Sequence, residues 1–278
     1  MLRSILLGLD GSDDSAGAIE LGVRWAKRFD CLLIGIGIVD EPTIRGAHPP
    51  GQVNPSYQAA YNQLLTQGRH SVEQSLEQFA IRCSEEKVAC KLLEDEGRPC
   101  EKILTELQRY DLLMLGCTTH FRHGSERHPC KTLETVLRET PRPVIAVPSR
   151  LTNLPGENIV VAYDGSTPAA RALQALVATD LCSLGTVQIL TVHSDSSLEA
   201  ARIAECAVEF LRFHNVEATR VPLVGNASAE LILEHAQENH ANLVVMGAYG
   251  KTRITEFLFG STTCQALQQT SIPLLLYH

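Results

Sequence analysis

The sequence predicts an α/β protein made of two tandem five-stranded, mostly parallel open sheets with helices on both faces. Three observations support this fold class. Short apolar runs alternate with longer stretches of helical periodicity. The short runs are apolar at nearly every position, which is typical of strands covered on both faces. The order of elements in the first half recurs in the second half, so we expect two domains, residues 1–150 and 156–278, each with the strand order 3-2-1-4-5.

The first half opens with an apolar run at 4–10 that predicts a strand. A helix is expected to follow as far as Phe29, because Ile19, Val23 and Ala26 recur at helical spacing. Four further strands are expected at 32–40, 88–94, 112–116 and 144–148. Further helices are expected up to Glu86 and over 101–109 and 132–139. The stretch 41–57 is rich in Pro and Gly, which predicts a long irregular loop.

The second half begins after a linker expected at 149–158. VVAYDGS at 160–166 repeats LLGLDGS at 6–12, and Ser166 or Thr167 is expected to cap the next helix. Its later strands are expected at 187–193, 218–224, 243–246 and 273–277, and its later helices at 198–213, 227–239 and up to Gln269. The matching order, with a proline opening the last strand of each half, indicates a duplication.

Composition limits the classes of function. The chain is 44% hydrophobic and 20% charged, as expected of a globular protein. A formal charge of -8 argues against a nucleic-acid partner, which would require a basic face. No apolar run approaches the roughly 20 residues that span a membrane. Nine scattered cysteines fit reduced thiols, so we expect a cytoplasmic protein.

A glycine-rich stretch follows the expected strand at 243–246. Its small residues have the spacing G-x2-G-x9-G-S and are Gly247, Gly250, Gly260 and Ser261. Glycines allow the backbone to approach a ligand, and a Gly-Ser pair at a helix start suits a phosphate. Lys251 and Arg253 would neutralise its charge. For any single glycine, a strand-end turn followed by an ordinary helix cap is the simpler interpretation.

An acidic residue is expected to face this glycine-rich stretch. In an open parallel sheet, ligands bind beyond the carboxyl ends of the strands where the strand order reverses. Asp164 ends the first strand of the second half and Gly247 ends the fourth, and these strands are neighbours in the expected order. The alternative for Asp164 is a turn former or helix cap. With the glycines opposite, we favour a role in ligand binding.

These features resemble the universal stress protein family, whose tandem members carry two such domains. The resemblance rests on the DGS after the first strand, the five-stranded α/β order and the G-x2-G-x9-G-S motif. It implies a Rossmann-like, adenine nucleotide alpha hydrolase-like fold and ATP, with or without Mg²⁺, in the second domain. The residues that it implies around the nucleotide are Ala162, Tyr163, Asp164, Val192, Met246, Gly247, Gly250, Gly260, Ser261, Thr262 and Thr263.

The resemblance also implies how the domains associate. Such domains commonly pair through their last strands, so 144–148 and 273–277 are the expected edges for pairing within the chain. A homodimer and an unidentified protein partner are further expectations.

The first half departs from the motif. Asp10 and Gly116 are kept, but Thr119 replaces the second glycine, and Cys130 and Lys131 occupy the places of the final Gly-Ser pair. A Cβ at each of these positions should obstruct a phosphate. We therefore expect that the first domain does not bind ATP in the manner of the family.

The same segment of the first half contains a cluster of thiols and imidazoles. Its members are Cys117, His120, His123, His128 and Cys130. These side chains suit zinc, which takes four of them in a structural site. Their spacing matches no zinc-finger pattern, and the simpler interpretation is a polar surface loop.

Three functional hypotheses follow. The first is an ATP-binding regulator of the stress response, the second is a slow ATPase, and the third is an interaction scaffold with an unused pocket. Hydrolysis requires a positioned base and a metal site. Asp164 is a candidate metal ligand and Glu256 and His193 are candidate bases, but no spacing singles out one of them. We therefore favour the regulator over the enzyme.

Overall fold

The protein folds into two compact α/β units. The structure, a computed structural model, describes residues 1–46, 55–121, 132–148, 157–248 and 261–278. One unit comprises Arg3–Arg142, here called the N-terminal unit. The other comprises Pro143–His278 together with Met1–Leu2, here called the C-terminal unit. The first two residues belong to it because the Leu2 N–H donates to the carbonyl oxygen of Thr179 over 3.1 Å.

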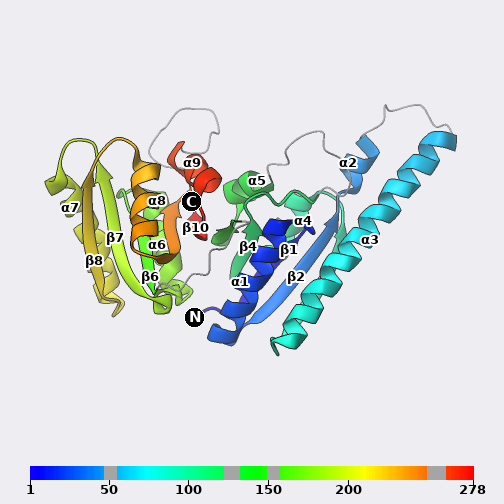
Figure 1. Cartoon of the computed structure of the whole chain (residues 1–278), viewed down its shortest axis with the longest axis horizontal. Helices are drawn as coiled ribbons and strands as arrows, with labels where there is room; N and C mark the ends of the chain where they lie inside the picture. The colour runs from blue at the N-terminus through cyan, green and yellow to red at the C-terminus, as the bar shows by residue number, and fades with distance from the viewer. Residues whose placement is uncertain (47–54, 122–131, 149–156, 249–260) are drawn as a thin grey trace. The chain divides into compact units, whose positions relative to one another are not determined.

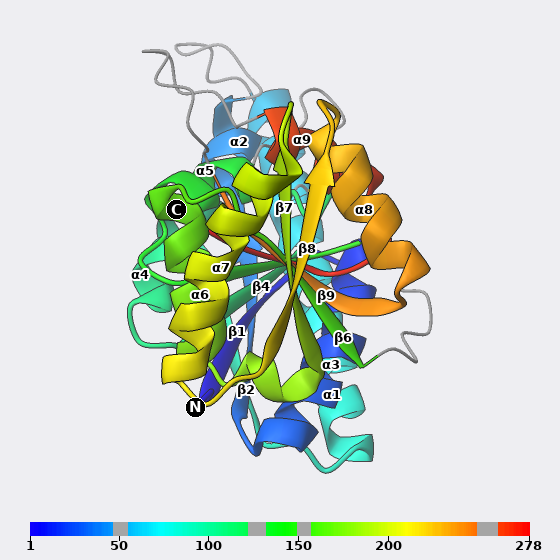
Figure 2. The same cartoon turned by 90° about the vertical axis from the view of Figure 1, so that its left-hand side faces the viewer.

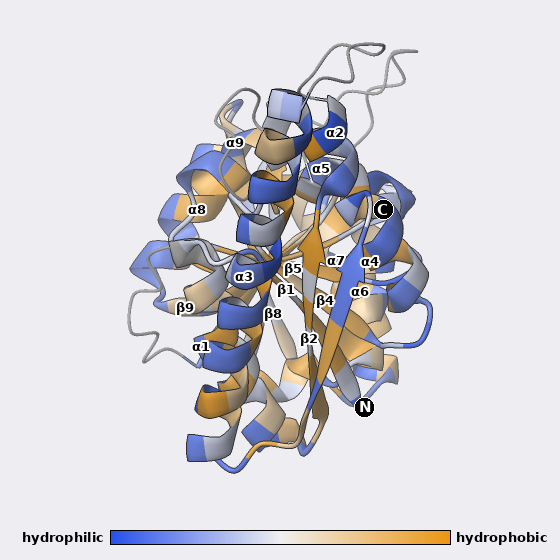
Figure 3. Cartoon of the chain, turned by 90° about the vertical axis from the view of Figure 1, so that its right-hand side faces the viewer, coloured by the Kyte–Doolittle hydropathy of each residue, from blue (hydrophilic) through white to orange (hydrophobic). Residues whose placement is uncertain are grey.

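The N-terminal unit contains a parallel sheet with the order β3-β2-β1-β4 (Figure 1). Its strands are β1 (Ser4–Leu9), β2 (Leu32–Val39), β3 (Cys90–Glu96) and β4 (Leu112–Gly116). Its helices are α1 (Asp13–Phe29), α2 (Glu41–Gly46), α3 (Pro55–Glu85), α4 (Pro99–Leu107) and α5 (Thr132–Glu139). Helices α1 and α3 cover one face of the sheet and α4 covers the other (Figure 3). The predicted fold class is confirmed in this unit.

The C-terminal unit has the strand order β5-β10-β9-β6-β7-β8. Its strands are β5 (Val144–Val147), β6 (Asn158–Ala162), β7 (Thr186–His193), β8 (Ala218–Val224), β9 (Ala241–Gly247) and β10 (Leu274–Tyr277). Its helices are α6 (Thr167–Ala178), the short 3₁₀ helix η1 (Leu181–Leu184), α7 (Ser197–Phe213), α8 (Ser228–Glu238) and α9 (Ser261–Gln269). Figure 2 shows α6 and α7 on one side of this sheet and α8 and α9 on the other.

Strand β5 differs from the expected division into two sheets of five strands. It lies with the C-terminal unit, where it pairs antiparallel with β10 through the register Leu274↔Ala146. All residues of β5 are buried, so its backbone groups need a partner strand within the fold. The two predicted last strands therefore do pair, as expected.

The loop predicted over 41–57 is wrong at both ends. Helix α2 occupies its first residues and α3 begins at Pro55, while residues 47–54 lie outside the described ranges. Asp40 supplies the helix start, because its carboxylate accepts the Thr43 N–H at 3.2 Å and the Thr43 hydroxyl at 2.6 Å. Pro42 then occupies the first turn, where its missing N–H costs nothing. Proline marks a helix start here rather than a loop.

Two glycines in β2 make room for α3. A Cβ on Gly35 would lie 2.8 Å from the Phe79 ring, and one on Gly37 would lie 2.6 Å from Val72. Strand side chains alternate between faces, so the residues between and beside these glycines face α4 instead. Figure 3 shows hydrophilic residues over much of α3.

No helix in the ranges listed above for the structure is both long and apolar enough to cross a membrane.

A network of ion pairs joins α1 to the C-terminal end of α3. Glu86 accepts from Lys27 at 2.6 Å and from Arg82 at 2.7 Å, and Arg82 also binds Glu20 at 2.6 Å. The hydrogen bond from Lys27 and the adjacent Arg82 guanidinium lower the pKa of the Glu86 carboxyl to about 2. The ionised carboxylate is therefore the form that stabilises this junction.

The substitution Glu86→Gln tests this network through pH. Because the folded pKa is below the unfolded value, the contribution is complete above the unfolded pKa of 4.5 and is lost as pH falls toward about 2. The urea midpoint of Glu86→Gln should be lower than that of the unmodified protein at pH 7. This difference should shrink steadily below about pH 4.5. The control is Glu77→Gln, an exposed residue of α3, and a difference independent of pH would contradict the assignment.

Candidate functional site

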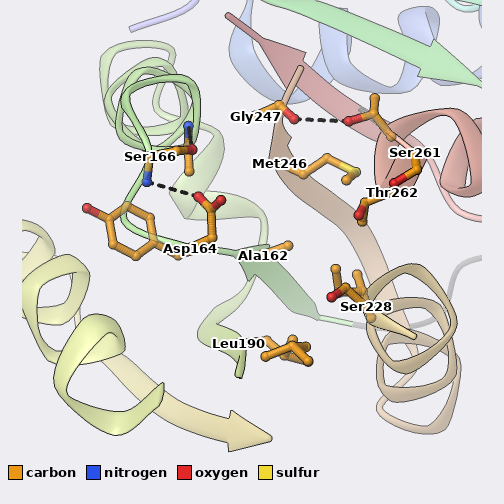
Figure 4. A pocket seen from close by; sticks show the side chains of 14 residues that line it. Ala162, Asp164, Ser166, Leu190, Ser228, Met246, Gly247, Ser261 and Thr262 are labelled. Carbon is orange, nitrogen blue, oxygen red and sulfur yellow. Dashed lines mark hydrogen bonds between the residues drawn. The ribbon is translucent and has the colours of Figure 1, made fainter. Parts of the chain in front are cut away.

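A cavity of about 190 Å³ lies in the C-terminal unit beside the carboxyl ends of β6, β7 and β9 (Figure 4). Strands β7 and β9 pair with β6 on opposite sides, so the strand order reverses at β6. At such a point the connections leave in opposite directions and a crevice remains open. The cavity thus lies where an open parallel sheet binds its ligands.

The turn from β6 into α6 supplies one wall. The Ser166 N–H donates to Oδ1 of Asp164 at 2.9 Å, and the left-handed Gly165 (φ 75°) closes this turn. The Ser166 hydroxyl in turn accepts the Ala169 N–H at 3.3 Å and caps α6. Asp164 is therefore a turn former as well as a lining residue of the cavity. Its role as a turn former is confirmed, and its role in ligand binding stays a prediction.

Tyr163 and Asp164 are the ionisable side chains of the cavity lining within the described ranges. Burial, followed by the proximity of Cys206 and Asp164, raises the pKa of the Tyr163 phenol above its usual value. Tyr163 is therefore a neutral phenol near neutral pH. Its carbonyl oxygen accepts the Thr191 hydroxyl at 2.7 Å, which ties this turn to β7.

The middle of the cavity is apolar. Its walls come from adjacent strands and from α8, and they are formed by Ala162, Leu190, Val192, Ile232 and Met246. Ala162 is the register partner of both Leu190 and Met246, so three neighbouring strands present one continuous apolar surface. Such a surface accommodates a flat, weakly polar group. Ser228 at the start of α8 adds one hydroxyl to this part of the lining.

The first turn of α9 forms the opposite wall. Ser261, Thr262 and Thr263 all line the cavity, and the Thr263 hydroxyl donates to the carbonyl oxygen of Gly247 at 3.2 Å (Figure 4). This bond fixes the start of the helix against the end of β9. The first N–H groups of a helix lack partners within it and carry partial positive charge. This end of the cavity therefore suits an anion.

Gly247 has a packing role besides its place in the cavity lining. A Cβ at this position would lie 2.6 Å from the backbone nitrogen of Ala169 and 2.7 Å from the carbonyl carbon of Pro168. The missing side chain therefore allows α6 to pack against β9, instead of only admitting a ligand. Close packing of α6 is what brings the Asp164 turn to the cavity.

The structure brings together every predicted nucleotide-site residue that it describes. Ala162, Tyr163, Asp164, Val192, Met246, Gly247, Ser261, Thr262 and Thr263 all line the one cavity. Gly250 and Gly260 lie outside the described residues, as do Lys251 and Arg253.

Sequence reasoning missed five lining residues, which are Ser166, Ala169, Leu190, Ser228 and Ile232. Leu190 could have been predicted from the alternation of strand side chains, because it precedes Val192 by two positions and therefore shares its face. Ser228 and Ile232 share one face of α8, and no sequence motif indicates that this face meets the cavity.

The candidate bases do not join this site in the described part of the structure. His193 is not among the lining residues, and its Nδ1 accepts the N–H groups of Asp195 at 3.2 Å and Ser196 at 3.1 Å. This ring nitrogen therefore caps a turn. Glu256 lies outside the described residues.

The candidate zinc ligands are only partly described. His123, His128 and Cys130 fall outside the described ranges, and within these ranges no group of three or more His, Cys, Asp or Glu side chains could hold a metal ion. His120 donates its backbone N–H to Asp10 at 2.8 Å. The zinc site stays a prediction.

Comparison with known proteins identifies the class. An open α/β sheet with a cavity at its switch point is a ligand-binding type of fold. The model of the universal stress protein family matches residues 1–148 and again 156–278. The chain therefore belongs to the universal stress protein family and is a tandem member.

Individual relatives agree with this assignment. The universal stress protein Slr1230 of Synechocystis sp. is 29% identical over 169 residues, which cover 60% of this chain and 58% of that relative. The matched part thus spans less than two thirds of the curated relative. A universal stress protein from Archaeoglobus fulgidus has the same fold, with a TM-score of 0.71, 18% identity, and coverage of 99% of this chain and 97% of that one. A functionally unknown protein from Pseudomonas aeruginosa PAO1 matches with a TM-score of 0.60, 18% identity and coverage of 99% and 92%.

The substitution Gly247→Ala tests the packing role of this glycine. The added methyl group must displace backbone atoms of α6, so we expect a loss of about 1–3 kcal/mol in the free energy of unfolding. Urea denaturation measures it. The control is Gly46→Ala, where a Cβ would meet no atom within 4 Å. Equal stability of the two variants would contradict the packing role.

Proposed function

We propose that this tandem universal stress protein binds an adenine nucleotide, ATP, in the cavity of its C-terminal unit. Occupancy of the cavity would regulate contacts with a protein partner in the stress response. The observation that carries the proposal is that Asp164, an apolar slot and the start of α9 line one cavity.

The two ends of the cavity differ in chemistry in a way that fits a nucleotide. The apolar slot between Ala162, Leu190 and Met246 suits a flat base. The start of α9, with the hydroxyls of its first turn and the positive end of the helix dipole, suits phosphates. Asp164 lies on the wall between β6 and α6, where its carboxylate can accept from ribose hydroxyls. An ion or a purely apolar ligand would use only one of these parts.

The substitution Ala162→Leu tests this proposal. Its side chain lines the slot, so the larger leucine should fill the space for the base. We expect at least about a tenfold loss of ATP affinity, because a base excluded from its slot loses more than about 1.4 kcal/mol of binding free energy. Calorimetric titration measures the affinity, and circular dichroism checks that the fold is retained.

The matched control is Ala170→Leu, the same change at an exposed residue of α6 that is not part of the lining. ATP affinity that is unchanged in Ala162→Leu, or reduced equally in both variants, would contradict the proposed site.

The second candidate function is a slow ATPase. Asp164 favours it to a limited extent, because a carboxylate that lines the cavity can hold Mg²⁺ beside a phosphate. The described lining offers no further general base, because its other ionisable residue, Tyr163, is a neutral phenol. We therefore place the regulator first.

The substitution Asp164→Asn separates the regulator from the ATPase. Asparagine keeps the side-chain oxygen that accepts the Ser166 N–H, so the turn into α6 should remain. If the protein is a regulator, phosphate release by the unmodified protein should not exceed that of Asp164→Asn. Phosphate release by the unmodified protein well above that of Asp164→Asn would instead establish the ATPase. The ratio of this activity to the amount of protein must then be constant over successive chromatographic fractions.

A further inference from the structure

The N-terminal unit repeats the frame of the C-terminal cavity. Its LLGLDGS segment corresponds to VVAYDGS, so Gly8 takes the place of Ala162. Gly8 pairs with Ile36 on the next strand, as Ala162 pairs with Leu190. The Gly8 side of this sheet is the α4 side, because its neighbour Leu7 contacts Gly22 of α1 on the other face. The face that carries the C-terminal cavity therefore has a direct counterpart.

In the N-terminal unit the aromatic ring of Phe121 occupies this counterpart. A Cβ on Gly8 would lie 3.0 Å from Cζ and 3.7 Å from Cε2 of Phe121, and close to Cδ2 of Leu115. Phe121, Leu115 and Ile36 are each 0% exposed. The surface that is open above Ala162 in one unit is thus covered by a ring in the other. The missing side chain of Gly8 makes room for Leu115, whose Cδ2 is the nearest atom, and for the tip of that ring.

The backbone just before Phe121 is tethered to the acid of the DGS segment. The Thr119 N–H donates to the Gly116 oxygen at 3.2 Å, which turns the chain back at the end of β4. The His120 N–H then donates to Oδ2 of Asp10 at 2.8 Å. The other oxygen of Asp10 accepts from the Ser12 N–H at 3.1 Å and the Ser12 hydroxyl at 2.6 Å. The Asp10 side chain is 0% exposed, whereas Asp164 lines an open cavity.

The backbone of Phe121 itself is strained. Its φ is 50°, in the left-handed region that bulky side chains rarely adopt. Such conformations persist only where the surroundings hold them, and they cluster at ligand sites and switches. The strain is what aims the ring at Gly8 after the tether at His120.

We propose that Phe121 is an internal substitute for a ligand, which closes a second, latent purine-nucleoside pocket in the N-terminal unit. The assignment of the ligand class rests on the proposed function of the C-terminal cavity. The tip of the Phe121 ring beside Gly8 takes the place that the base would take beside Ala162. Displacement of the ring would also release the His120 N–H from Asp10, and the freed carboxylate would face the sugar hydroxyls.

The experiment removes the ring in a background in which the C-terminal cavity is filled. Calorimetric titration with adenosine is compared for Ala162→Leu alone and for Ala162→Leu combined with Phe121→Ala. We expect the double variant to bind one adenosine per chain, at least about tenfold more tightly than Ala162→Leu alone, which corresponds to about 1.4 kcal/mol.

The matched control is Ala162→Leu combined with Phe79→Ala. Phe79 of α3 is also 0% exposed, but it packs on the opposite face of the same sheet, against Gly35. This variant loses a buried ring of equal size and should not gain adenosine binding. Gain of binding in both double variants would indicate a non-specific cavity and would overturn the proposal.

Two further outcomes are decisive. A folded Phe121→Ala double variant that gains no adenosine binding overturns the proposal. If that variant does not fold, Phe121→Leu in the same background keeps an apolar contact with Gly8, and its gain or lack of adenosine binding decides in the same way. Failure of the C-terminal site is distinguishable, because it appears as absent binding in the unmodified protein and leaves the comparison of the double variants intact.

Discussion

The reversal of strand order at β6 is the constraint on which the site depends. Strand β7 pairs on one side of β6 and β9 on the other, so the carboxyl ends of three parallel strands lie at one edge of the sheet. The turn after β6 and the start of α9 place an acid and a helix N-terminus on opposite walls of the cavity. The packing of Gly247 against α6 serves this arrangement, because it holds the start of α6 beside the end of β9. The strand order therefore determines where the acid and the helix N-terminus of the cavity lie.

The two units share the same strand ends and turns but differ in what lies over the middle strands. Each has a DGS turn, an apolar patch over the middle strands and a glycine at the end of its fourth strand, Gly116 or Gly247. In the C-terminal unit the patch lines a cavity of about 190 Å³. In the N-terminal unit Phe121 covers it, and the DGS carboxylate is bonded to the backbone of His120. The altered glycines of the first half are thus accompanied by a second difference, because Phe121 covers the patch that lines a cavity in the other unit.

Local sequence signals gave the fold class, the repeat and the convergence of Asp164 with Gly247, because each depends on strand periodicity and on the rule for open sheets. They could not give contributions that depend on which helix face meets which strand. Ser228 and Ile232 belong to this group, and so does Phe121, whose position results from a backbone conformation that sequence does not reveal. The start of α2 was missed for another reason. An acidic residue followed closely by proline occurs both in loops and at helix starts. Only the hydrogen bonds of Asp40 show that a helix starts here.

The closed pocket of the N-terminal unit is held by opposing terms of similar size. A left-handed conformation for a residue with a side chain costs about 1–2 kcal/mol. Burial of an aromatic side chain contributes roughly 1.5–3 kcal/mol in return. The balance favours the closed form by only about 1 kcal/mol, before the hydrogen bond to Asp10 is included. A balance of about 1 kcal/mol corresponds to about a factor of five in apparent affinity, so the ring lowers the binding of a competing ligand without abolishing it. A plug of this strength closes a site to weak ligands while it leaves the site available to a ligand that makes more contacts than one phenyl ring.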